Sequence, residues 1–142
     1  MKHLLILIFA IIAIFVTAGA QKSASLKVPD TVKIAFAKKY PGVAAKWEQE
    51  DGKYEAGFKQ NGRSISVLYE RDGTLTETEI DIKASELPEN VLAYVKTHYK
   101  GKSIKEGAKI TKADGTINYK AEVNDIDVIF NADGSFLKEI KD

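Results

Sequence analysis

The sequence predicts an α+β protein in which one helix followed by a four-stranded antiparallel meander occurs twice in tandem. Three observations lead to this fold class. The second half of the chain repeats the order of the first, each half opens with an amphipathic helical pattern, and each continues with short alternating segments separated by turn dipeptides. The predicted repeats cover about residues 26–82 and 85–140, with both helices packed on one face of the sheet.

The first 20 residues have the composition of a cleavable signal peptide. A lysine and a histidine precede an apolar run from Leu4 to Val16, and Ala18-Gly19-Ala20 supplies the small residues that a signal peptidase requires. The run is shorter than the roughly 20 apolar residues of a membrane-spanning helix. We therefore expect cleavage before Gln21, a domain over residues 21–142 in the periplasm or outside the cell, and no stable membrane insertion afterwards. An uncleaved anchor is the alternative.

Composition restricts the class of protein further. The chain has 142 residues, of which 44% are hydrophobic and 29% charged, so one domain with a substantial core is expected. Its net charge of +1 falls to zero when Lys2 is removed with the signal segment. A balanced charge argues against nucleic acid as a partner, and the absence of cysteine excludes both disulfides and a lipid anchor on cysteine.

Each predicted repeat begins with a helix. In both helices apolar residues recur at the spacing that lines one face, and a proline stands near the start. Pro41-Gly42 ends the first helix and Gly101 is placed to cap the second. The predicted apolar stripes are Val32, Ala35, Phe36 and Tyr40 in the first helix, and Leu87, Val91, Tyr94, Val95 and Tyr99 in the second.

Four strands are predicted after each helix, joined by turns that in the first repeat are typical of two-residue hairpins. They cover about 43–50, 53–60, 63–70 and 74–82, then 103–112, 116–123, 126–131 and 135–140. The turns fall at Asp51-Gly52, Asn61-Gly62, Asp72-Gly73, Asp114-Gly115, Asn124-Asp125 and Asp133-Gly134.

Alternation along these strands separates two faces of the sheet. One face collects large apolar side chains such as Tyr54, Val67 and Phe130 and is expected to meet the helices. The opposite face is mostly polar, although Leu68, Ile129 and Leu137 also fall on it, and it is expected to see solvent. A broad solvent-facing sheet suits another macromolecule better than a small molecule.

The sequence resembles the PepSY-like proteins described as similar to the beta-lactamase inhibitory protein. The resemblance extends over residues 26–140. It depends on K-Y-P-G at the end of the first helix, on W-E-x-E-D-G-x-Y-E at 47–55, and on L-P-x-x-V at the start of the second repeat. Lys100 replaces Pro41 in the second copy, and Glu106 or a neighbour stands where the first copy has Trp47. The resemblance implies an exported, non-enzymatic module that binds proteins, as an inhibitor, through the concave face of the sheet. No contact residue for beta-lactamase is carried over.

Few residues suggest chemistry, and we expect no catalytic, cofactor or metal site. His98 is the single histidine after residue 20 and lies near a helix end, where a polar residue is favourable. Two acidic groups could in principle hold a hard cation, but solvated strand and turn positions are the favoured interpretation. These groups are Glu77, Glu79 and Asp81, and Asn124 with Asp125 and Asp127.

Trp47 has two interpretations. Its alternation with Ala45 and Val43 favours packing under the first helix, while a tryptophan on a first strand could also be a binding hot spot.

The function hypothesis is a protein or protease inhibitor, or another binding module, whose partner is an extracytoplasmic protein. The candidate contact residues on the solvent-facing sheet are Glu55, Leu68, Lys120 and Ile129. Two alternatives remain: a carrier of a small apolar ligand held between helices and sheet, and a structural envelope protein.

Overall fold

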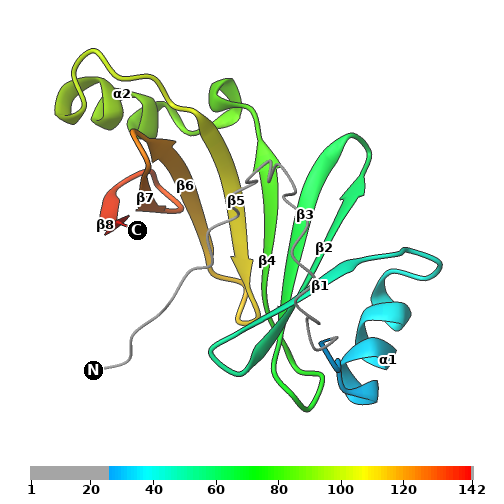
Figure 1. Cartoon of the computed structure of the whole chain (residues 1–142). Coiled ribbons are helices and arrows are strands. Elements are labelled where there is room, and N and C mark those ends of the chain that lie inside the picture. The colour runs from blue at the N-terminus through cyan, green and yellow to red at the C-terminus, as the bar shows by residue number, and fades with distance from the viewer. Residues whose placement is uncertain (1–25, 142) are drawn as a thin grey trace, which may run out of the picture.

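The structure, a computed structural model, describes residues 26–141; the predicted signal peptide lies outside these residues. Eight strands form a single antiparallel sheet in the order in which they occur in the chain, and two α-helices accompany it (Figure 1). The predicted mixture of two helices with an antiparallel meander is therefore confirmed.

The elements alternate one helix with four strands. The first group is α1 (Asp30–Lys39), β1 (Lys46–Glu50), β2 (Lys53–Gln60), β3 (Arg63–Tyr69) and β4 (Leu75–Ile82). A short 3-10 helix, η1 (Ala84–Glu86), leads to the second group: α2 (Glu89–His98), β5 (Glu106–Lys112), β6 (Ile117–Val123), β7 (Ile126–Asn131) and β8 (Phe136–Lys141). Strands β1 and β5 start three residues later than the sequence predicts, at Lys46 and Glu106.

Both helices begin and end in the same way. Pro29 and Pro88 are the N-cap residues, and the amides of Tyr40 and Tyr99 donate the last helical hydrogen bonds to Phe36 and Val95. Two residues after each of these tyrosines a glycine adopts positive φ, at 76° for Gly42 and 74° for Gly101, so the chain can reverse toward the sheet.

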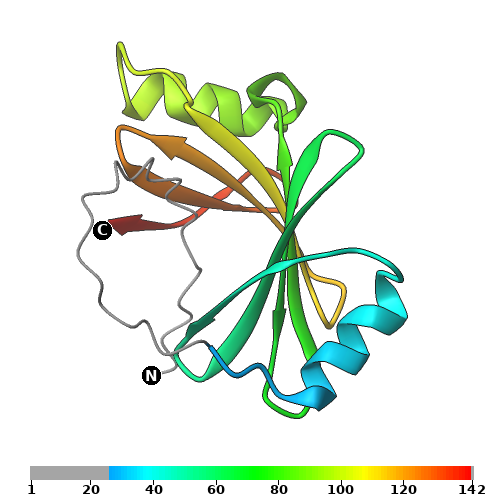
Figure 2. The same cartoon turned by 45° about the vertical axis from the view of Figure 1, so that its right-hand side comes forward.

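The two helices pack on the same face of the sheet. Register shows this because directly paired residues project from one face. Ile65 pairs with Ile80, Ile80 with Lys109, and Lys109 with Tyr119. Ile65 belongs to the apolar core under α1, whereas Tyr119 packs against the core under α2. One continuous face therefore carries both cores, and the two helices lie well apart along the sheet (Figure 2).

The two cores draw on equivalent strands of each half. Under α1 lie Val32 and Phe36 with residues of β2 and β3, including Ala56 and Val67. Under α2 lie Val91 and Val95 with residues of β6 and β7, including Ala121 and Val128.

The hairpin turns are of two kinds, and the prediction of a two-residue turn is wrong at Asp72-Gly73. At Asp51-Gly52, Asn61-Gly62 and Asn124-Asp125 both residues have positive φ, as tight two-residue turns require. At Asp72-Gly73, Asp114-Gly115 and Asp133-Gly134 only the glycine does. The amide of Gly73 donates to the carbonyl oxygen of Glu70 at 2.9 Å, which makes a three-residue loop with a bulge, and the other two turns repeat this bond.

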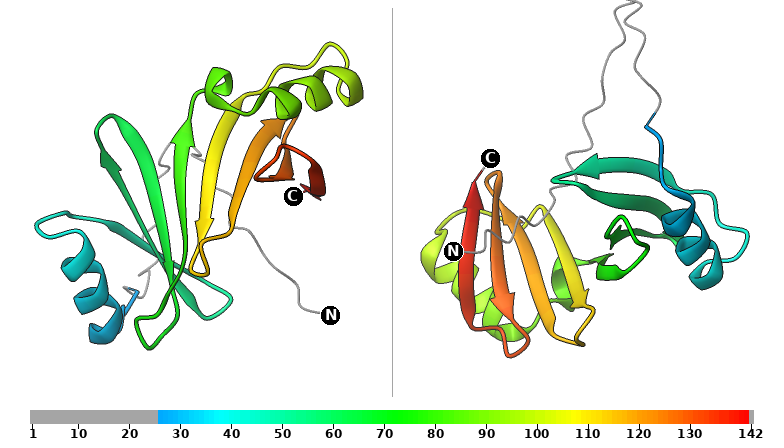
Figure 3. Two further views of the ribbon diagram at one scale, coloured as in Figure 1. Left: turned by 180° about the vertical axis from the view of Figure 1, so that it is seen from behind. Right: turned by 90° about the horizontal axis from the view of Figure 1, so that it is seen from below.

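The prediction that the sheet face opposite the helices is exposed to solvent is also wrong for the residues at the centre of that face. Ile110 and Ile129 are fully buried there, and Glu55 and Lys120 are only 3% and 5% exposed. The sheet twists and curls so strongly that its two ends are far from coplanar (Figure 3). Curling crowds the side chains that project from this face, and they cover one another.

Candidate functional site

The candidate site is the sheet face opposite the helices, which we call the open face. Register groups the four predicted contact residues into two pairs. Glu55 is directly opposite Leu68 across β2 and β3, and Lys120 is directly opposite Ile129 across β6 and β7. The structure brings the members of each pair together but places the two pairs in different halves of the sheet.

Glu55 is held within the open face. The hydroxyl of Ser66 on β3 donates a hydrogen bond to Glu55 Oε1. Only 3% of the surface of Glu55 is exposed, so this carboxylate is buried and held in place by the serine. Leu68, by contrast, is half-buried and remains accessible.

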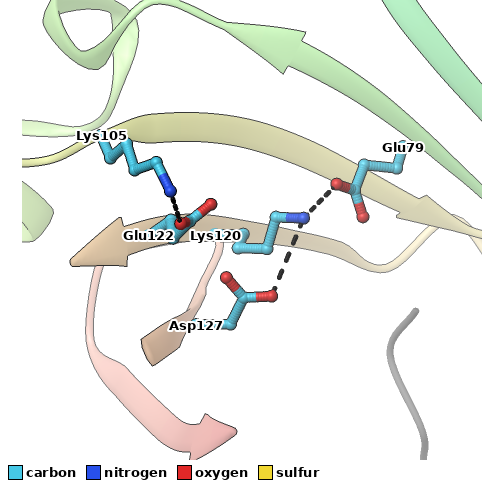
Figure 4. Close-up of polar contacts among 5 residues, drawn as sticks. All are labelled: Glu79, Lys105, Lys120, Glu122 and Asp127. Carbon is cyan, nitrogen blue, oxygen red and sulfur yellow. Dashed lines mark hydrogen bonds and ion pairs between the residues drawn. The ribbon is translucent and has the colours of Figure 1, made fainter. Parts of the chain in front are cut away.

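Lys120 is the centre of an ion-pair network that joins the two halves. Its Nζ contacts Glu79 Oε1 on β4 and lies 3.9 Å from Asp127 Oδ2 on β7 (Figure 4). A second pair lies beside it, with Lys105 Nζ 3.0 Å from Glu122 Oε1 (Figure 4). Removing one member of the buried network would leave a buried charge without compensation, so its members position the face and do not move freely.

Burial changes the ionisation of this network. Burial raises the pKa of Glu79 to about 7, even though Lys120 acts in the opposite direction. Burial lowers the pKa of Lys120, but the carboxylates of Glu79 and Asp127 outweigh it, so this pKa is raised above its ordinary value. The lysine is therefore charged at neutral pH, whereas Glu79 titrates close to neutral pH.

Ile129 belongs to a small apolar cluster on the open face. It packs with Ile110, both fully buried, and the partly buried Ile140 lies against them. Three of the four predicted contact residues are therefore buried beneath the accessible surface of the open face. These are Glu55, Lys120 and Ile129.

A cavity of about 220 Å³ opens on the β1 to β5 part of this face. Gly57 contributes no side chain and leaves space beside Ser66, while Asp81 and Glu106 also line the cavity. Gly57 and the cavity were missed by the sequence analysis. The available signal was a glycine inside a strand pattern, which often marks close approach of another group. The lining residues are Lys46, Gly57, Phe58, Lys59, Ser64, Ile65, Ser66, Glu79, Asp81 and Glu106.

The acidic groups considered for a cation are used in other ways. Glu79 contacts Lys120, and Asp127 is buried beside the same lysine, whereas Asp125 is exposed in a turn 3.6 Å from Lys105. No group of three or more histidines, aspartates or glutamates within residues 26–141 is arranged to hold a metal ion.

His98 lies at the C-terminal end of α2. Its Nδ1 is 3.0 Å from the carbonyl oxygen of Tyr94, and its ring stacks on the Tyr94 ring at 3.9 Å. Tyr94 in turn stacks on the exposed Phe136. The histidine therefore completes an aromatic stack at the helix end.

Trp47 lies on the helix-covered face. It pairs with Ala56, packs against the core under α1, and meets Phe36 edge to face at 5.3 Å. The core interpretation of Trp47 is the one that this geometry favours.

Comparison with known proteins assigns the family. Residues 52–138, more than half of the chain, match a family model described as beta-lactamase-inhibitor-like and PepSY-like. The chain belongs to this PepSY-like family, as its sequence motifs predicted. No curated protein sequence matches the chain significantly.

Solved structures of three Bacteroides proteins share the fold. A protein of Bacteroides eggerthii described as "putative periplasmic" has a TM-score of 0.73 at 20% identity, covering 80% of this chain and 88% of that chain. A DUF2874 family protein of Bacteroides ovatus has a TM-score of 0.70 at 24% identity, covering 80% and 87%. A BLIP-like protein of Bacteroides fragilis has a TM-score of 0.67 at 23% identity, covering 82% and 88%. Within residues 26–141, no helix has the length and apolar character needed to cross a membrane.

Proposed function

We propose that this protein is an exported, non-enzymatic module that binds an extracytoplasmic protein through its open face. The observation that carries the proposal is a continuous eight-stranded sheet face that neither helix covers, hollowed near β2 to β4 and supported by buried charges. Such a face has a fixed shape before a partner arrives, which lowers the ordering cost of association. Residues 1–20 are proposed as the cleaved signal peptide that exports it.

The similarity to proteins described as inhibitor-like and BLIP-like supports a binding role, with inhibition as its specific form. The description of one structural neighbour as periplasmic supports the compartment. The balanced charge of the chain favours a protein partner over nucleic acid.

We further infer that the two halves arose as copies of one unit and that the duplication widened the open face. Matching details support this. Thr31 Oγ1 donates to the carbonyl oxygen of Arg71 at 2.8 Å, and Asn90 Nδ2 donates to that of Asp133 at 2.9 Å, so each helix holds the loop between the third and fourth strands of its half. In each half, the pairing of the third and fourth strands also shifts register at an equivalent place, next to Tyr69 in the first half and next to Phe130 in the second.

The carrier and structural envelope hypotheses remain predictions. A carrier of an apolar ligand needs a cavity between helices and sheet, whereas the cavity described above lies on the open face. It therefore does not favour the carrier.

Capture of a partner tests the proposed function. Residues 21–142 are immobilised, exposed to envelope extract from the source cell, and the bound proteins are identified by mass spectrometry. The test variant is Leu68→Arg, because Leu68 is the accessible member of the predicted contact set. The matched control is Ile34→Arg, since Ile34 is 68% exposed on α1, away from the open face.

We expect one protein to be enriched by the native chain and by I34R and to be lost with L68R, while both variants keep native circular dichroism. Enrichment that is the same with L68R, or no enrichment by the native chain, would contradict binding through the open face.

A further inference from the structure

The cavity on the open face has the form and charge of a receptor for one side chain. We propose that it receives a lysine or arginine side chain of the protein partner, with the cationic head between Asp81 and Glu106. The inference rests on the proposed function and specifies the chemistry of its partner.

The apolar part of the cavity follows from the way in which two strands separate. The β3–β4 ladder ends at the pair Ile65 and Ile80, whereas the β4–β5 ladder continues to Ile82. Beyond Ile65 the strands diverge, and the bare backbone of Gly57 lies in the space between Lys46 and Ser66. Phe58 and Ile65 border the space, with their side chains in the core under α1. The surface of the cavity is mainly apolar. A mainly apolar wall of this kind accepts the methylene stem of a long side chain.

Two of the acidic residues that line the cavity are available to a ligand. Asp81 and Glu106 are both exposed, and neither carboxylate makes an ion pair or hydrogen bond with another residue of the described chain. They lie close together on the open face, because Asp81 pairs with Ala108, two residues along the same strand from Glu106. Burial raises the pKa of Glu106, and the nearby charges of Glu122 and Asp81 raise it further, while Lys120 and Lys105 act in the opposite direction.

The lysines around the cavity have other carboxylates as ion-pair partners, and Lys120 and Lys105 attract these two carboxylates only without direct contact. Lys46 Nζ is 2.7 Å from Glu48 Oε1, and Lys120 contacts Glu79. Lys59 is exposed at the rim. A cation on the partner would therefore gain two charge-assisted contacts without displacing an existing pair.

Other occupants fit less well. A bare metal ion would need at least three converging ligands, and residues 26–141 offer no such group. An anionic side chain would meet the carboxylates as a like charge. A flexible apolar stem that ends in a cation satisfies both parts of the cavity.

The direct test is a nuclear magnetic resonance titration of residues 21–142 with Nα-acetyl-lysine amide. Nα-acetyl-norleucine amide is the matched probe, because it keeps the stem and lacks the ammonium group. The test variant is Asp81→Asn with Glu106→Gln. The control is Asp51→Asn with Glu89→Gln, which removes the same charge at two exposed residues, in a turn and at the start of α2, that do not line the cavity.

We expect the lysine probe to shift the amide signals of Gly57, Asp81 and Glu106 at millimolar concentration, and the norleucine probe to shift them at least fivefold less. The double variant should weaken the lysine response at least fivefold and the control should not. Equal responses to the two probes, or an unchanged response in the double variant, would overturn the inference.

The same variants separate this inference from the proposed function. If a partner is captured by the native chain and lost with L68R but binds D81N/E106Q as tightly as the native chain, the cationic site is wrong and the binding module stands. If the lysine probe responds as expected but no partner is captured, the side-chain receptor stands and the proposed function fails.

Discussion

At the scale of single residues, Trp47 gives a direct test of the core under α1. Trp47→Ala removes an edge-to-face contact with Phe36 on the helix-covered face, so we expect the free energy of unfolding to fall by about 2–3 kcal/mol. Urea unfolding followed by circular dichroism measures this change, with Trp47→Phe as the milder control. Binding by the remaining folded protein should be unchanged. Full stability together with lost binding would instead identify Trp47 as a contact residue.

Glu79 gives a prediction on pH. Its folded pKa of about 7 exceeds its ordinary value of 4.5, so the folded state holds this proton more tightly than the unfolded state. The stabilising effect is complete below about pH 4.5 and is lost as pH rises through about 7. The free energy of unfolding should fall by up to about 3 kcal/mol over this window, at about 1.4 kcal/mol for each pKa unit.

Urea unfolding at several pH values between 4.5 and 8 checks this slope, and Glu79→Gln should flatten it. Burial also raises the pKa of Glu77, which adds to the slope in both proteins. Asp72, Asp114 and Asp133 have lowered pKa values and act below this window. An equal slope in E79Q would assign the pH dependence to other groups.

The accessibility of single residues on the open face was the part that the sequence did not predict. Alternation placed Glu55, Lys120 and Ile129 on the correct face, because side-chain direction is a local property of a strand. Their burial depends on how strongly eight strands curl together, which no short segment encodes. Alternation therefore predicted that Glu55 and Lys120 are exposed to solvent, whereas both side chains are buried.

At the scale of elements, three loops of the same kind allow a controlled test of helix attachment. Gly73, Gly115 and Gly134 have φ of 89°, 86° and 82°. A Cβ on Gly73 would come within 2.7 Å of the carbonyl oxygen of Thr31, whereas nothing lies within 4 Å at Gly115. We expect Gly115→Ala to cost about 1 kcal/mol through backbone strain alone.

Gly73→Ala should cost about 2–3 kcal/mol, because the loop must also move away from the first turn of α1. Thermal unfolding of both variants measures the difference. Equal losses would show that contact with the helix contributes nothing beyond the positive φ.

Element boundaries were predictable where the chain encodes them locally. Proline at both helix starts and Asx-Gly pairs at the hairpins are local signals, and they located the helices and turns to within a few residues. The type of turn was harder to predict from the sequence. Asp51-Gly52 and Asp72-Gly73 look alike in sequence, yet the second belongs to a longer loop because its aspartate accepts the amide of Thr74 and its strands are shifted by a bulge.

At the scale of the whole molecule, the two halves are joined by more than adjacent strands. Strands β4 and β5 pair over six residues of each, and the ion pair of Glu79 with Lys120 connects the first half to the second. Ile110 and Ile129 add an apolar cluster on the open face of the second half. We therefore expect the sheet to unfold as one cooperative unit.

Ile129→Ala tests this cooperativity, since Ile129 is fully buried in the second half and Trp47, the single tryptophan, lies in the first. Loss of the buried side chain should lower the free energy of unfolding by about 2–4 kcal/mol. If the sheet is one unit, the Trp47 fluorescence transition in urea and the circular dichroism transition should shift together. Leu137→Ala, at a position 44% exposed on β8, is the control and should change both by less than about 1 kcal/mol. A fluorescence transition that stays in place while circular dichroism shifts would mean that the halves unfold separately, and a partner bound across the open face would then have to hold them together itself.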